Sequence, residues 1–302
     1  MRIFENTNYG FTTARRKGYI FSAILLLISL GSFFLHGLEV GIDFKGGREF
    51  VVDSDNVMDV AAVRGILADA LGAEPEVKSY GEDMLLVRAA GAEDVTQVQN
   101  AIISALAEAF PDSNPRIEGT YAVSPRFADD LKRGAIYSIL GSLLVIFVYI
   151  LLRFEWRFGV GAVAALFHDV TITLGVFSIL HGFVPFSLQI DQTIIAAFLT
   201  IVGYSLNDTV VVFDRIREYT GIFKSESYDA IVNKSINNTL SRTIVTSGTT
   251  LFVVTVLFIF GGEVLRGFAF ALMFGVIIGT YSSIFVATPL VLELRRRAVT
   301  TR

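Results

Sequence analysis

The sequence of 302 residues contains no cysteine, only three histidines and a single tryptophan. The absence of cysteine excludes disulfide bonds and thiolate metal sites, and three scattered histidines do not form the pattern of a zinc site. Charged residues make up only 18% of the chain, and the net charge is −4. The cysteine and histidine content therefore predicts no metal cofactor. Basic patches with interleaved aromatic residues are also missing, so we expect no nucleic-acid partner.

Long apolar runs dominate the chain instead, since 53% of its residues are hydrophobic. Each run is long enough to cross a hydrocarbon layer of about 30 Å as a helix. Backbone groups in lipid must be hydrogen-bonded within the segment, which favours helices. The six predicted spans are about 18–37, 134–152, 158–180, 192–213, 244–262 and 267–292.

The basic residues predict how these spans are oriented, because lysine and arginine concentrate on the cytoplasmic side. Those assigned to one side are Arg15, Arg16, Lys17, Arg153, Arg157, Arg215, Arg217, Lys224, Lys234, Arg242, Arg295, Arg296 and Arg297. The short turns on the other side, about 181–191 and 262–266, contain only Arg266 among lysines and arginines. We therefore predict a multi-pass membrane protein with both termini in the cytoplasm. The first run is about twice as long as the apolar part of a signal peptide, so we expect an uncleaved span.

Residues 39–130 form a soluble block that this topology places outside the cytoplasm. Its pattern predicts strand, helix, strand, strand, helix and strand, the order of a ferredoxin-like split βαβ unit. A generic α+β domain is the alternative. The expected elements are 40–53, 57–71, 76–80, 84–88, 94–109 and 116–123, with a hairpin turn at 81–83.

The predicted fold class is therefore an α-helical membrane protein of six spans with an inserted extracytoplasmic ferredoxin-like domain. Residues 1–38 hold the cytoplasmic N-terminus and first span, and residues 131–302 hold the other five spans. The only long cytoplasmic connection, about 214–243, is polar but contains spaced apolar residues. It is interpreted as an amphipathic connecting helix on the membrane surface, or as a simple connector.

Asp208 lies inside the fourth apolar run, in the segment 203–209. An acid near the centre of a membrane helix costs about 2.5–3.5 kcal/mol, so such residues usually face a bundle interior and have a function. Its polar neighbours, which could line a small hydrated path, are Tyr204, Ser205, Asn207 and Thr209. We predict a role in ion or proton movement, with a structural ion pair as the alternative.

Two further ionisable groups lie in other spans. Arg242 begins the fifth run at a depth close to that of Asp208, and Thr246 continues a polar stripe one turn later. Arg242 is either a partner of Asp208 or a cytoplasmic anchor. Asp169 follows His168 about 16 Å along the third run, where it is either a relay residue or a polar tie between helices.

Two glycine pairs have structural interpretations. Gly275 and Gly279 form a small-xxx-small face that predicts close helix packing. Gly46 and Gly47 lack the lysine and hydroxyl residue of a phosphate loop, so they predict a bulge or a sharp turn.

Three segments resemble the SecD/SecF family of bacterial protein-export membrane proteins. Residues 41–47 are similar to its signature after the first span, 203–218 to its fourth-span signature and 240–247 to the entry of its fifth span. The motif residues after the first span are Asp43, Phe44, Gly46 and Gly47.

The resemblance implies a location in the bacterial inner membrane and an architecture similar to resistance-nodulation-division transporters. It implies that SecD, the SecYEG channel, the translocating polypeptide and membrane lipids are the partners, and that protons are the coupling ion with no other cofactor. In this family the proton gradient promotes late export, and the matching proton-responsive residues are Asp208 and Arg242, extended to Asp169. The family's working unit is a twelve-span pair, of which this chain supplies one half.

Three other functions are considered. A half-unit of a lipid or drug exporter would need an external pocket, and the outer block is small for that task. An intramembrane aspartyl protease could use Asp169 and Asp208, but Asp208 follows Gly-Tyr-Ser-Leu-Asn rather than Gly-x-Gly. A passive assembly factor would not need Asp208 at all. Because the aspartyl protease motif does not match, we do not expect an enzyme.

Overall fold

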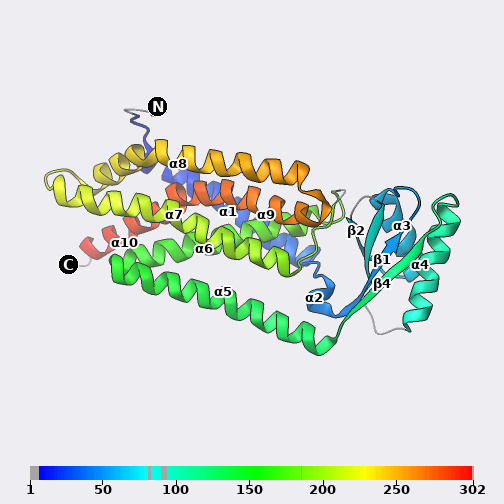
Figure 1. Cartoon of the computed structure of the whole chain (residues 1–302). Coiled ribbons are helices and arrows are strands. Elements are labelled where there is room, and N and C mark those ends of the chain that lie inside the picture. The colour runs from blue at the N-terminus through cyan, green and yellow to red at the C-terminus, as the bar shows by residue number, and fades with distance from the viewer. Residues whose placement is uncertain (1–6, 81–82, 90–93, 185, 301–302) are drawn as a thin grey trace.

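The computed structural model describes residues 7–80, 83–89, 94–184 and 186–300. Six long apolar helices lie side by side in a bundle, and a small α+β domain lies at one end of it (Figure 1). The start of the first long helix and the last described helix lie toward the opposite end of the bundle. This arrangement confirms the predicted fold class, whereas the side that faces the cytoplasm stays a prediction.

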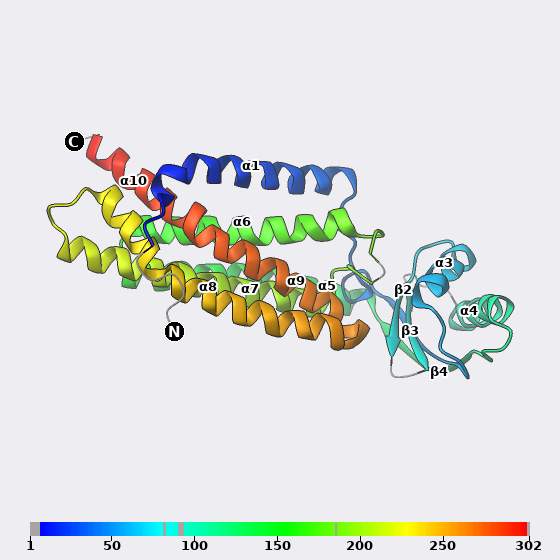
Figure 2. The ribbon, with the colours of Figure 1, turned by 90° about the horizontal axis from the view of Figure 1, so that it is seen from above.

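Each predicted span overlaps one long helix, since a helix satisfies its own backbone hydrogen bonds in lipid. The first five are α1 (Phe11–Leu35), α5 (Pro125–Arg153), α6 (Trp156–Leu180), α7 (Gln192–Ile222) and α8 (Tyr228–Phe260). The sixth consists of α9 (Gly262–Ser282), a π-helical turn (Ser283–Ala287) and α10 (Thr288–Thr300). Helices α6, α7 and α9 are the most buried of the spans, while α5 is exposed along most of its length. Helix α6 lies between α1 and the pair α7 and α8 (Figure 2).

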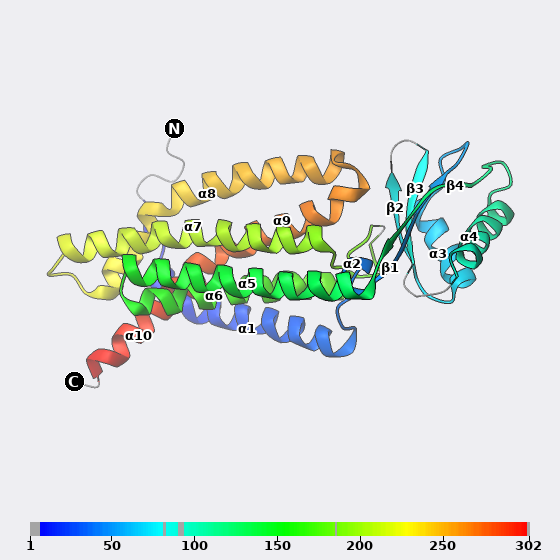
Figure 3. The same ribbon diagram turned by 60° about the horizontal axis from the view of Figure 1, so that its bottom comes forward.

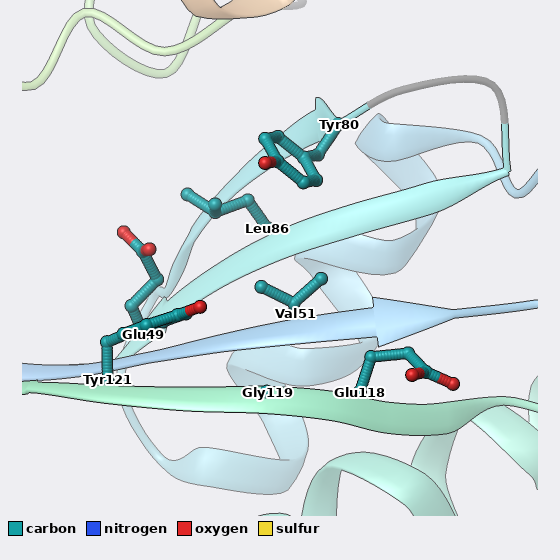
Figure 4. Close-up of a pocket in the computed structure, with 7 residues that line it drawn as sticks. All are labelled: Glu49, Val51, Tyr80, Leu86, Glu118, Gly119 and Tyr121. Carbon is teal, nitrogen blue, oxygen red and sulfur yellow. The ribbon is translucent and has the colours of Figure 1, made fainter.

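The small α+β domain, which we call the outer domain, has the predicted ferredoxin-like order. Its antiparallel sheet has the order β2-β3-β1-β4, formed by β1 (Gly47–Asp53), β2 (Glu76–Tyr80), β3 (Met84–Ala89) and β4 (Arg116–Val123). Helices α3 (Val60–Leu71) and α4 (Val95–Ala109) cover the face that points away from the bundle (Figure 3). The opposite face of the sheet contains a hollow of about 330 Å³ lined by residues that include Glu49, Tyr80 and Tyr121 (Figure 4).

The first predicted strand is too long, because only Gly47–Asp53 is extended. Residues before it form a short helix, α2 (Ile42–Lys45), which follows from the burial of Phe44 in an apolar cluster of the bundle. Gly46, with φ of 76°, makes the sharp turn between helix and strand in a conformation that glycine adopts readily. The bulge lies elsewhere, at Val51/Val52 where β1 shifts register against β4. The turn residues 81–82 lie outside the described residues.

The segment 214–243 is not a separate connecting helix. It consists of the ends of α7 and α8, which meet at a short turn after Ile222. Several of its apolar residues are buried inside the chain rather than placed on a membrane surface, as Ile216, Ile236 and Leu240 show with at most 7% exposure, although Ile222 at the turn is 60% exposed. The outer domain also ends earlier than residue 130, because Ser124 caps α5 and the helix begins at Pro125.

Candidate functional site

Asp208 lies where α7, α8 and α9 meet, and only 4% of the residue is exposed. Its Oδ2 accepts a hydrogen bond of 3.1 Å from Ser247 Oγ on α8. Ser247 in turn accepts a bond of 2.7 Å from Thr280 Oγ1 on α9. Because a hydroxyl can both donate and accept, these three side chains form a polar chain that joins three spanning helices.

Asp169 forms a second buried cluster, centred on α6. Its Oδ2 accepts bonds from Ser205 on α7 (2.6 Å) and from Ser282 on α9 (2.7 Å). Its Oδ1 lies 2.9 Å from His168 Nδ1, and His168 Nε2 lies 3.1 Å from Ser22 Oγ on α1. The imidazole therefore bridges Asp169 and α1, so protonation of this pair would affect contacts with three neighbouring helices.

One turn of α9 connects the two clusters. Its consecutive residues Thr280, Tyr281 and Ser282 reach α8, α1 and α6 respectively, with Tyr281 at 3.0 Å from Ser22 Oγ. The π-helical turn Ser283–Ala287 follows directly, and such turns are frequent at functional sites. This turn was not predicted from the sequence, although four consecutive hydroxyl residues inside an apolar run, at 280–283, were a usable signal.

The predicted neighbours of Asp208 do not all surround it. Ser205 is directed to Asp169, and Thr209 donates to the backbone oxygen of Ser205 at 3.1 Å. Asn207 is exposed, and the buried hydroxyl of Tyr204 has no hydrogen-bond partner within the described residues. The four side chains point in different directions because consecutive residues rotate around the helix.

Arg242 is exposed on α8. Within the part of the chain that the structure describes, no hydrogen bond or ion pair joins it to Asp208. Thr246 donates to the backbone oxygen of Arg242 at 2.9 Å, and Thr249 continues the stripe as an exposed residue. The predicted polar stripe therefore exists but faces outward from this chain, like Asn207 on α7.

The motif after the first span supports the start of α7. Asp43 Oδ2 accepts the backbone N–H of Gln192 at 3.1 Å, and Phe44 packs in the same apolar cluster as Leu188. A side chain at Gly46 would approach Pro125 Cα to 3.3 Å, which accounts for glycine there. This motif thus positions the helix that contains Asp208.

The chain is similar to known protein-export proteins. A family model described as protein export membrane protein SecD/SecF, C-terminal, matches residues 102–297. The protein translocase subunit SecF of Rhodothermus marinus is 64% identical over 100% of this chain and 98% of its own length, and that of Cereibacter sphaeroides is 43% identical over 96% and 90%.

A crystal structure of SecDF, a translocon-associated membrane protein from Thermus thermophilus, superposes with a TM-score of 0.80 at 33% identity. The match covers 96% of this chain but only 39% of that chain. The present chain therefore corresponds to less than half of the SecDF polypeptide.

Proposed function

Because the chain belongs to the SecD/SecF family of protein-export membrane proteins, we propose that it couples the proton gradient to late steps of polypeptide translocation. Membership makes the chain an accessory subunit of protein export rather than an enzyme. Its relatives are named as translocase subunits, and nothing in those names supports a lipid exporter, a drug exporter or an aspartyl protease.

The observation that carries the proposal is the burial of Asp208 in a spanning helix, with a hydroxyl chain to two other helices. An ionised carboxylate only accepts hydrogen bonds, whereas a protonated one can also donate. Gain or loss of a proton therefore changes the bond with Ser247 and the packing of α7 on α8. Asp169, through Ser205 and Ser282, is the second proton-binding group of this scheme.

The energies involved are adequate. One charge moving through 100 mV is worth about 2.3 kcal/mol. Hydrogen bonds between membrane helices contribute about 0.6 kcal/mol on average. A single proton can therefore outweigh several such bonds and shift the helices between two packings.

A SecD-type subunit is the proposed partner in the membrane, together with the SecYEG channel. Polar residues on two adjacent spans are exposed on this chain, and we call them the α7–α8 face: Thr200, Asn207, Arg242 and Thr249. Polar side chains directed at hydrocarbon are costly, so a second membrane subunit would cover this face. Arg242 would then supply a positive charge at the interface.

Substitution of Asp208 in the assembled complex tests the function. We expect Asp208→Asn to assemble in normal amounts but to lose the response of export to the proton gradient in membrane vesicles. Glu218→Gln is the matched control, because this exposed acid lies on the same helix and pairs with Arg215 at 2.9 Å. Gradient-dependent export by Asp208→Asn at the control level would contradict the proposal and favour a passive assembly factor.

A further inference from the structure

A lysine is buried between the outer domain and the membrane bundle. The side chain of Lys78 on β2 is 9% exposed, and its Nζ lies 2.6 Å from Glu76 Oε1 and 3.3 Å from Asp191 Oδ2. Burial alone would lower the pKa of Lys78, but the carboxylates of Glu76 and Asp191 outweigh burial and raise it above 10.5. Lys78 is therefore a cation at neutral pH, held between an acid of the sheet and an acid of the bundle.

A second cation extends this cluster across the sheet. Arg88 on β3 donates from Nε to Glu49 Oε2 at 2.6 Å and from Nη1 to Glu76 Oε2 at 3.4 Å. The same Nη1 lies 3.9 Å from Asp191 Oδ2. Ser187, in the loop before α7, also donates to Glu76, at 3.3 Å. Three strands of the outer domain are thus linked through charged groups to the loop that enters α7.

Asp191 is the point where this cluster meets the helix. Its Oδ2 faces Lys78 while its Oδ1 accepts the backbone N–H of Ile194 at 2.9 Å, which caps the start of α7. The preceding residue, Ile190, pairs with the chain leaving α1 through two backbone bonds of 2.9 and 3.0 Å. A Cβ at Gly41 would lie 3.5 Å from Asp191 Cβ, so the chain segments here are in close contact.

From these contacts we propose that Glu76, Lys78, Arg88 and Asp191 form a rigid joint, which passes movements of α7 to the outer domain. The proposal rests on the proposed function, because the movement begins at Asp208. Asp208 and Asp191 belong to one helix and its cap, about 25 Å apart at 1.5 Å per residue. A continuous helix transmits tilt over that length, and a buried network of opposite charges resists sliding at its end.

Two substitutions test the joint in the full chain assembled with its native partners. Lys78→Gln removes the cation that lies between Glu76 and Asp191. Asp191→Asn removes the anion of the bundle while keeping a good helix cap. We expect both to reduce gradient-dependent export by about fivefold or more, the lower end of usual coupling between sites. Arg116→Ala is the control, since its ion pair with Asp53 at 2.7 Å also lies in the outer domain but its side chain is 58% exposed. Export at the control level in both joint variants would overturn the proposal.

A reversible cross-link gives a second test that uses one protein as its own control. The chain has no cysteine, and the Cβ separation of 3.5 Å suits a disulfide between Gly41→Cys and Asp191→Cys. The reduced double variant lacks the ionic tie and should export poorly. Oxidation replaces the tie with a covalent bond and should restore export at least severalfold. Equal export in the two forms, or less export after oxidation, would overturn a rigid joint.

Parallel measurement of Asp208→Asn separates this inference from the proposed function. If Asp208→Asn retains gradient-dependent export, the proposed function fails and the joint fails with it. If Asp208→Asn loses gradient-dependent export but Lys78→Gln and the reduced double variant retain it, only the joint fails.

Discussion

Ser205 on α7 donates a hydrogen bond of 2.6 Å to Asp169 on α6, and not to Asp208, which lies three residues further along its own helix. Asp208 instead accepts from Ser247 on α8. Helix α7 is therefore tied to α6 through one acid and to α8 through another. A proton that binds either acid changes the contacts of the same helix, which makes α7 the element where the two clusters are coupled.

Removal of the Ser205 hydroxyl should weaken the isolated subunit. We expect Ser205→Ala to lower the free energy of unfolding by about 0.6 kcal/mol, and by no more than about 1.7 kcal/mol, the range for hydrogen bonds between membrane helices. Thermal unfolding in detergent measures the change. Ser142→Ala is the control, because Ser142 donates to the backbone oxygen of Ile139 in its own helix. Equal melting temperatures for the two variants would show that the bond to Asp169 does not stabilise the subunit.

Gly279 keeps α9 close to Ser205. A Cβ at this position would lie 2.9 Å from Ser205 Cβ and 3.3 Å from its Cα. We expect Gly279→Ala to cost about 1–3 kcal/mol, the usual penalty for overpacking, and to move Ser205 away from Asp169. Gly141→Ala on α5 is the matched control, because a Cβ there would meet no atom within 4 Å. A Gly279→Ala subunit as stable as the Gly141→Ala subunit would contradict the tight packing of α7 and α9.

The α7–α8 face should be needed for assembly but not for folding. Asn207 is exposed on α7. Asn207→Leu should therefore change the free energy of unfolding of the isolated subunit by no more than about 0.5 kcal/mol. We expect the same variant to lose co-purification with the SecD-type subunit. Gly31→Leu on α1, where a Cβ would meet nothing within 4 Å, serves as the control. Normal co-purification of Asn207→Leu would place the partner on another face.

The two acids could be found from the sequence because an acid inside an apolar run is costly wherever its helix lies. Their partners could not, because partners depend on how each helix is rotated and on which neighbour it meets. Ser205 and Asp208 are close on the helix surface, yet α6 and α8 lie on different sides of α7. Depth along the helix suggested that Arg242 meets Asp208. The arginine is exposed on α8 and forms no ion pair with Asp208 within the described residues, although its charge acts on Asp208.

The outer domain was predictable to a similar degree. The residue pattern of the soluble block predicted the order of its elements, and Asp94 caps α4 by accepting a bond from Thr96 N. Two features escaped prediction because they depend on distant contacts. Burial of Phe44 in the bundle replaces the start of the first strand with α2. Lys78 meets Asp191 across a sequence separation of 113 residues, which no local pattern reveals.

Because Lys78 is charged, the stability of the isolated subunit should change with pH in the alkaline range. Lys78→Met removes the closer cation from Glu76 and Asp191 and leaves Arg88, at 3.4 and 3.9 Å, as the cation beside both acids. The change should cost up to about 3–5 kcal/mol at neutral pH, the usual result of breaking a buried ion pair. The pKa of Lys78 is raised in the folded chain from 10.5, so its stabilising contribution is complete below 10.5 and is lost as pH rises through the raised value.

The difference in unfolding free energy between the wild type and Lys78→Met should therefore stay constant up to pH 10.5 and shrink above it. Thermal unfolding across this range measures the difference, with Lys132→Met as the control. Lys132 is 52% exposed and pairs with Asp129 at 3.6 Å, and an exposed pair of this kind contributes about 0–1 kcal/mol. Its variant should follow the wild type at every pH. A Lys78→Met curve parallel to the wild type through the alkaline range would show that Lys78 is not held as a cation by Glu76 and Asp191.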